Sequence, residues 1–169
     1  MARMALQITD VDDGVFQDKV GNQISAATSP SIGDLVALWM ADGGSDIGVW
    51  VTFDMPGFSG TPAIVTSFIL DGAPGASDVF AQAIRKRAVA IGEAGDGTFD
   101  AEETDGGTTI GSSGAGHSNE DIIEGSTDLT GANYTEGDRV LMHVYLDASV
   151  MTYAGNIGLL EVMLDYTPA

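Results

Sequence analysis

Short apolar runs separated by clusters of Gly, Asp, Ser and Pro dominate the pattern of hydrophobic and polar positions along this chain. Most runs are too short for a typical helix and are rich in β-branched and aromatic residues, which favours strands. We find no convincing long amphipathic helix. The expected strands cover residues 35–41 (LVALWMA), 47–53 (IGVWVTF), 62–70 (PAIVTSFIL), 79–91, 121–129, 138–148 and 157–166.

The last two of these segments alternate most regularly. In residues 138–148, one face carries Val140, Met142, Val144 and Leu146, and the other carries Leu141, His143 and Tyr145. In residues 157–166, the expected inward face holds Leu160, Val162, Leu164 and Tyr166, and the outward face holds Leu159, Glu161, Met163 and Asp165. A period of two is what half-buried antiparallel strands require.

Two further predictions concern local structure. Residues 35–41 and 47–53 are separated by the turn cluster DGGSD, which predicts a hairpin. The segment VFAQAIRKRAVAI, residues 79–91, contains good helix formers, but turn-rich stretches bound it on both sides. We therefore predict a strand there.

Together these segments predict an all-β fold, an antiparallel β-sandwich or jelly roll. The sandwich is expected to span residues 31–169. Residues 1–30 are polar with isolated apolar positions, and we expect them to form an extended N-terminal arm with one strand around Met4 to Ile8.

Charge excludes several classes of partner. The 169 residues include 25 acidic and 6 basic side chains, for a net charge of −19, and no cysteine. Such a surface repels phosphate backbones and anionic lipid, so we expect neither nucleic acid nor membrane as a partner. Disulfides, thiolate catalysis and zinc–thiolate sites are ruled out by composition.

A long stretch from Glu93 to Asp121 is rich in Gly and acidic residues and contains no Lys or Arg. As an EF-hand loop starting at Asp96 it fails, because the required Gly and Glu positions hold Ala101 and Gly107. A looser calcium or magnesium site remains open among Asp96, Asp100, Glu102, Glu103 and Asp105; otherwise no cofactor is expected. The alternatives are a solvated flexible loop and an ordered loop that docks on a partner.

No catalytic constellation emerges from the sequence, and we expect a protein that is not an enzyme. GSSGAGHS, residues 111–118, resembles a phosphate loop but has His117 in place of the lysine, and acidic residues follow it. Ser112, Ser113 and Ser118 with His117 and Asp121 supply the residue types of a triad without its geometry. We expect His143 on a strand face, at an interface or at the edge of the sandwich.

Aromatic residues raise the possibility of sugar binding. Trp39 and Trp50 lie inside apolar strands and are expected to be core residues. Tyr134 and Tyr153 lie in expected loops and are the better candidates for stacking on a sugar.

Arg85, Lys86 and Arg87 make up half of all basic residues. In a strand, Arg85 and Arg87 share one face and Lys86 takes the other. Two interpretations stay open, an edge strand protected by charge and a basic patch that meets an acidic surface. The candidate interface residues are therefore Arg85, Lys86, Arg87, His117 and Tyr134.

The second half of the chain, roughly Val79 to Tyr166, has a particular order of segments: VFAQAIRKRAVAIG, a Gly/Asp/Thr-rich stretch, EGDRVLMHVYLDAS, MTYAGNIG and LLEVMLDY. This order resembles small jelly-roll structural proteins of tailed phages, either capsid decoration (cement) proteins or tail-associated sandwich domains. The resemblance implies a virion component without catalysis, often a trimer, that contacts the major capsid protein.

Two hypotheses follow. The leading one is a capsid decoration protein on the virion surface, a homotrimer whose arm and long loop contact neighbouring subunits. The alternative is a tail- or fibre-associated β-sandwich module that binds carbohydrate.

Overall fold

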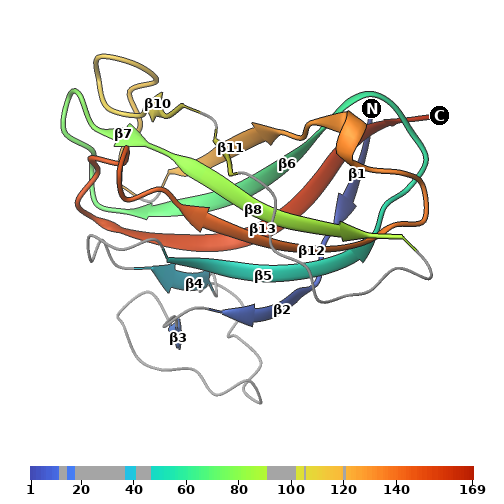
Figure 1. The fold of residues 1–169 in the computed structure, drawn as a ribbon. Coiled ribbons are helices and arrows are strands. Elements are labelled where there is room, and N and C mark those ends of the chain that lie inside the picture. The colour runs from blue at the N-terminus through green and yellow to red at the C-terminus, as the bar shows by residue number, and fades with distance from the viewer. Residues whose placement is uncertain (12–14, 18–36, 41–46, 91–101, 105, 120) are drawn as a thin grey trace.

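Strands account for nearly all the regular structure in the computed structural model, which describes residues 1–11, 15–17, 37–40, 47–90, 102–104, 106–119 and 121–169. They form two antiparallel sheets packed face to face, as Figure 1 shows. The prediction of an all-β sandwich is confirmed.

One layer, sheet A, has six strands, all paired antiparallel. Its order is β11-β6-β13-β4-β3, with β1 also paired to β13. The strands are β1 (Ala2–Ala5), β3 (Val15–Gln17), β4 (Ala37–Met40), β6 (Phe58–Asp71), β11 (Ile122–Asp128) and β13 (Asn156–Pro168).

The second layer, sheet B, has five antiparallel strands in the order β2-β5-β12-β8-β9. These are β2 (Ile8–Val11), β5 (Ile47–Asp54), β8 (Gln82–Val89), β9 (Glu103–Thr104) and β12 (Arg139–Leu146). A two-stranded ribbon joins β7 (Val79–Phe80) to β10 (Thr108–Thr109). Both short strands β9 and β10 lie within the long acidic stretch.

The core lies between the two sheets, where alternate residues of each strand are buried. Val140, Met142, Val144 and Leu146 of β12 share one face, as predicted, and that face points inward. The opposite sheet contributes residues such as Ile64 and Leu164, which are fully buried.

The N-terminal residues belong to both layers. β1 pairs with β13 in sheet A, and β2 pairs with β5 in sheet B. Between them Leu6 is buried, and its N–H donates to the Val162 carbonyl at 2.8 Å. The expected single strand around Met4 to Ile8 is thus two strands. The rest of the predicted arm, apart from β3, lies outside the described residues.

The predicted hairpin between residues 35–41 and 47–53 is wrong. β4 pairs with β13 and β3 in sheet A, whereas β5 pairs with β12 and β2 in sheet B. The connection crosses from one sheet to the other. A turn cluster between two apolar strands does not distinguish these cases, because both connections need a chain reversal.

The predicted faces of β13 are wrong for its first half. A bulge between Leu159 and Glu161 shifts the pairing with β6. Before it, Ile157 and Leu159 point into the core; after it, Val162 and Leu164 do. An extra residue in one strand reverses the alternation, so no single period of two fits the whole segment.

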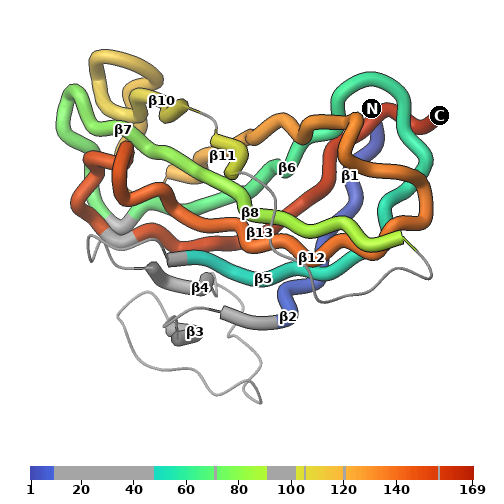
Figure 2. The backbone as a smooth tube through the Cα atoms, viewed as in Figure 1, coloured from blue at the N-terminus to red at the C-terminus, as the bar shows by residue number. Residues whose placement is uncertain are grey.

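Loops from three parts of the chain meet at one end of the sandwich, beside β7 and β10 (Figure 2). Ile110 N–H donates to the Asp78 carbonyl, Ser113 N–H to Ala76, and Thr152 N–H to Val79. Within the described residues, no helix is long and apolar enough to cross a membrane; the helical turn η1 spans Gly131–Asn133.

Candidate functional site

The outward side of sheet B brings polar and aromatic side chains from three adjacent strands into register. The pairing of β12 with β5 and β8 aligns Trp50, His143 and Arg85 in one cross-strand line. The next line along the strands holds Thr52, Leu141 and Arg87. Because neighbouring strands lie about 4.8 Å apart, side chains in such lines touch. We call this side of sheet B the outer face.

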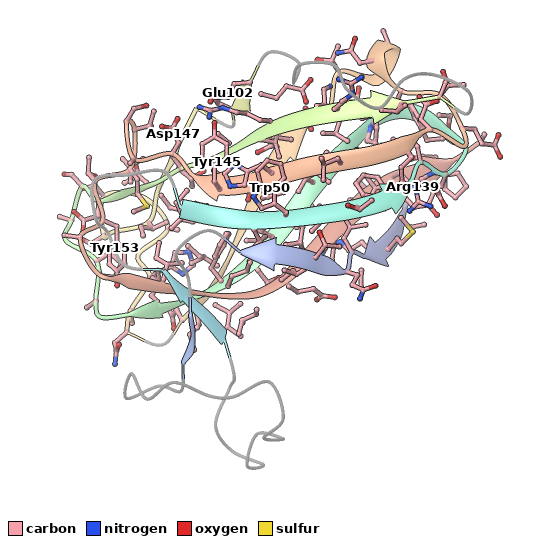
Figure 3. The ribbon with its side chains drawn as sticks, turned by 60° about the horizontal axis from the view of Figure 1, so that its bottom comes forward. Trp50, Glu102, Arg139, Tyr145, Asp147 and Tyr153 are labelled. Carbon is pink, nitrogen blue, oxygen red and sulfur yellow. The ribbon has the colours of Figure 1, made fainter. Side chains whose placement is uncertain are left out.

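Three rings on the outer face stack on one another, and we call Trp50, His143 and Tyr145 the ring row. The ring centroids of Trp50 and His143 are 4.5 Å apart with planes 17° from parallel. Those of His143 and Tyr145 are 4.8 Å apart at 20°. Figure 3 shows Trp50 and Tyr145 along this face, with Glu102 beyond Tyr145. Near-parallel contacts of this kind stabilise both the rings and their orientation.

Glu102 and Arg85 close one end of the ring row. The Arg85 guanidinium carbon lies 5.1 Å from the centre of the Tyr145 ring. Arg85 donates from Nε and Nη2 to the same oxygen of Glu102, at 3.2 and 3.0 Å. The Tyr145 hydroxyl donates to that oxygen as well.

The ring row is only partly open to solvent. Tyr145 is 3 % exposed and His143 8 %, whereas Trp50 is half-buried. The neighbouring Leu141 is 36 % exposed. A ligand on this face would therefore meet Trp50, Leu141 and the flanking arginines, with the deeper rings as a rigid support.

A second Arg–acid pair lies at the other end of the outer face. Arg139 Nε is 2.9 Å from Asp54 Oδ1, and both side chains are well exposed. These residues are directly paired across β12 and β5. In Figure 3, Arg139 lies at the end of the sheet away from Glu102, with Trp50 between them.

The inward side of β8 carries a buried ion pair. Lys86 is 1 % exposed, and its Nζ lies 2.9 Å from Glu103 Oε1 and 4.1 Å from the centre of the Tyr134 ring. Thr130 N–H donates to the same oxygen of Glu103 at 3.0 Å. Burial raises the pKa of Glu103, but hydrogen bonds from Thr130 and Lys86 outweigh it and leave that pKa below its usual value.

The pairs Arg85–Glu102 and Lys86–Glu103 are related to each other. The consecutive acids Glu102 and Glu103 meet the consecutive bases Arg85 and Lys86, one pair on the outer face and one inside the sandwich. β9 pairs with β8 beside them, at Ala83 and Ile84. This part of the long acidic stretch is thereby fixed to sheet B.

The predicted interface residues fall into separate places. Arg85 and Arg87 share the outer face, as predicted for a strand. Lys86 and Tyr134 meet in the interior, away from the surface where a partner would reach them. His117 lies in the loop after β10, where its Nδ1 is 3.6 Å from Asp121 Oδ2. They do not form one patch.

Three of the four aromatic assignments are reversed. Trp50 is on the outer face rather than in the core, and the side chain of Trp39 lies outside what the structure describes. Tyr134 and Tyr153 are buried, and Tyr153 donates to the Gly72 carbonyl at 3.1 Å. The alternation in β5 carried the missed signal, because Val49, Val51 and Phe53 occupy the opposite parity from Trp50.

A cation site receives no support from the described residues. Among them, no group of three His, Asp or Glu side chains is placed to hold a metal ion. Glu102 and Glu103 point to opposite sides of β8. The other residues of that hypothesis, Asp96, Asp100 and Asp105, lie outside the described part.

No known protein family matches the sequence, and no curated protein does. Solved structures with a similar fold include a xylan-binding module CBM15, 14% identical with a TM-score of 0.46, aligned over 99% of each chain. The CBM22-2 xylan-binding domain of Paenibacillus barcinonensis Xyn10C is 10% identical (TM-score 0.47; 98% of this chain and 99% of that one). The K1 cleaved adhesin domain of Lys-gingipain from Porphyromonas gingivalis W83 is 13% identical (0.39; 99% of each). This likeness concerns the β-sandwich fold.

Proposed function

We propose that this chain is a non-catalytic module that binds carbohydrate on the outer face of sheet B. The observation that carries the proposal is the ring row, which places Trp50 at the surface of a sheet rather than in its core. Two Arg–acid pairs, Arg85 with Glu102 and Arg139 with Asp54, lie at the two ends of this face.

The chemistry of this face suits a sugar. A pyranose ring has C–H groups on its faces and hydroxyl groups around its rim. Aromatic and aliphatic surface, here Trp50 and Leu141, packs against the C–H groups, and fixed donors and acceptors bind the hydroxyls. Because the three rings stack on one another, few side chains need to be ordered on binding, which lowers its entropic cost.

The face is also long enough for a chain of sugars. From Arg139 to Tyr145 the strand advances six residues, or about 20 Å at the usual rise of a β-strand. The module is therefore expected to bind a polysaccharide segment rather than a single monosaccharide.

Affinity electrophoresis through gels that contain soluble polysaccharides tests the proposal. At least one polysaccharide should retard the wild-type chain. Trp50→Ala should weaken that binding about tenfold or more, because the residue at the centre of a binding face contributes most. Trp50→Phe, which keeps a ring on His143, should lose less.

Phe58→Ala provides a matched control, since Phe58 is another partly buried aromatic residue, packed against the core from β6 of sheet A rather than from the outer face. It should keep wild-type retardation, and melting curves should show that each variant is folded. Retardation by no polysaccharide, or equal loss in both alanine variants, contradicts the proposal.

The capsid-decoration hypothesis stays a prediction from the order of segments between Val79 and Tyr166. Its trimer, its major capsid protein partner and its place on the virion stay predictions with it. The ring row favours carbohydrate as the ligand, so the carbohydrate-binding alternative takes precedence.

A further inference from the structure

We propose that the outer face of sheet B binds a glycan that carries carboxylate groups, that is, one containing uronic acid residues, and that Glu102 occupies the carboxylate position when no ligand is bound. This inference rests on the proposed function and specifies its ligand class.

The face already binds a carboxylate, which belongs to Glu102. One oxygen of Glu102 accepts hydrogen bonds from Nε and Nη2 of Arg85, at 3.2 and 3.0 Å, and from the Tyr145 hydroxyl. Charge-assisted bonds from a planar guanidinium are the usual way in which proteins recognise carboxylates. The same donors at the end of the ring row would hold the carboxylate of a sugar whose ring packs beside Trp50.

The distribution of basic residues favours the same ligand. Of the 6 Lys and Arg in a chain of charge −19, Arg85, Arg87 and Arg139 all project from the outer face. The described acids that meet them there are Glu102 and Asp54. Among the residues that the structure describes, this face therefore has a higher share of positive charge than the chain as a whole.

At physiological salt, a ligand on the outer face is affected more by the charges next to it than by the net charge of the chain. The Debye length there is about 8 Å, and the two sheets of a sandwich lie about 10 Å apart. Acids on the far sheet are therefore largely screened from a ligand on the outer face, while arginines in contact with it are not. At low salt the screening is lost, and the net negative charge should weaken the binding.

Glu102 can be replaced by a ligand because its ion pair is at the surface. The side chains of Arg85 and Glu102 are 49% and 36% exposed. Exposed pairs of this kind contribute little to folding stability. An incoming carboxylate can therefore take the position of Glu102 without unfolding the sheet, although Glu102 competes with it.

The test compares polygalacturonate, alginate and hyaluronate with their carboxyl-reduced forms, which keep the backbone and lack the charge. Titration calorimetry of the full chain should show binding to at least one acidic polymer and at least about tenfold weaker binding to its reduced form. Equal binding to both forms, or binding to neutral glycans alone, overturns the inference and leaves the proposed function standing. Binding to no glycan, acidic or neutral, overturns both.

Two variants with matched controls locate the site. Arg85→Gln should abolish most of the preference for the acidic form, and Glu102→Gln should strengthen binding on the order of fivefold by removing the competitor. Arg3 and Glu124 form a similarly exposed pair between β1 and β11 of sheet A, at 2.9 Å. Arg3→Gln and Glu124→Gln change the net charge equally and should leave the affinity unchanged. Equal effects of the two pairs of variants would assign the preference to net charge and overturn the inference.

Discussion

At the scale of single residues, several Asp side chains accept hydrogen bonds from the backbone of the turns in which they lie. Three turns repeat one arrangement, in which an Asp accepts the N–H of the residue three positions earlier and donates its own N–H back to that residue's carbonyl. The pairs are Gly75 with Asp78, Ser118 with Asp121, and Thr135 with Asp138. Each Asp immediately precedes a strand, so part of the acidic excess shapes the turns of the sandwich.

The buried pair of Lys86 and Glu103 predicts a pH dependence of stability. Because the pKa of folded Glu103 is lowered, its charge stabilises the fold above the unfolded value, 4.5, and this contribution is lost as the pH falls through the folded pKa. Glu103→Gln should therefore be less stable than the wild type at neutral pH, and the difference should narrow below about pH 4.5. Urea unfolding from neutral pH down to about pH 3 measures it.

Glu124→Gln is the control for this experiment, since Glu124 lies at the surface of sheet A. Its stability should follow that of the wild type at every pH. A gap between wild type and Glu103→Gln that stays constant or widens on acidification would contradict the account of the buried pair.

At the scale of elements, the antiparallel register of β5, β12 and β8 builds the candidate site. Gly48 lies opposite Tyr145 in that register, and a Cβ at Gly48 would lie only 2.2 Å from the Val144 carbonyl oxygen and 2.4 Å from the Tyr145 Cβ. The backbone of β5 can approach Tyr145 this closely only with glycine there.

Gly48→Ala should therefore push β5 away from Tyr145. We expect a loss of about 1–3 kcal/mol in the free energy of unfolding, measured by urea denaturation, together with weaker glycan binding. At Gly131, where an added Cβ meets ordinary contacts of 3.4 Å or more, the change to Ala should cost less than 1 kcal/mol, a rough bound for an unstrained site. Similar losses at both positions would contradict the role of Gly48.

The elements also show what sequence could and could not predict. The period of two correctly assigned both faces of β12, because that strand is regular along its full length. It failed in β13 because of the bulge at Leu159 and Glu161. Arg85, Lys86 and Arg87 were correctly divided between two faces, but their partners Glu102 and Glu103 come from a segment with no strong strand signal.

At the scale of the whole molecule, the sandwich places the ring row on the outer face of sheet B and the buried ion pair on the inner side of the same sheet. The fold class followed from the sequence because short strands and turns leave few alternatives. The strand order did not, since hydrophobic pattern does not tell which sheet a strand joins; hence the incorrect hairpin of β4 and β5. Trp50 was assigned to the core for a related reason, because the apolar run around it concealed its outward parity.

The measurement that tests the central claim most directly is a nuclear magnetic resonance titration of the labelled chain with the polysaccharide fragment that binds it. The side-chain N–H signals of Trp50 and Arg85 should shift with the same affinity as the calorimetric binding, while that of Arg3 on sheet A stays unchanged. Shifts that gather on sheet A or in the loop around His117, with Trp50 and Arg85 unmoved, would contradict the assignment of the outer face as the binding site.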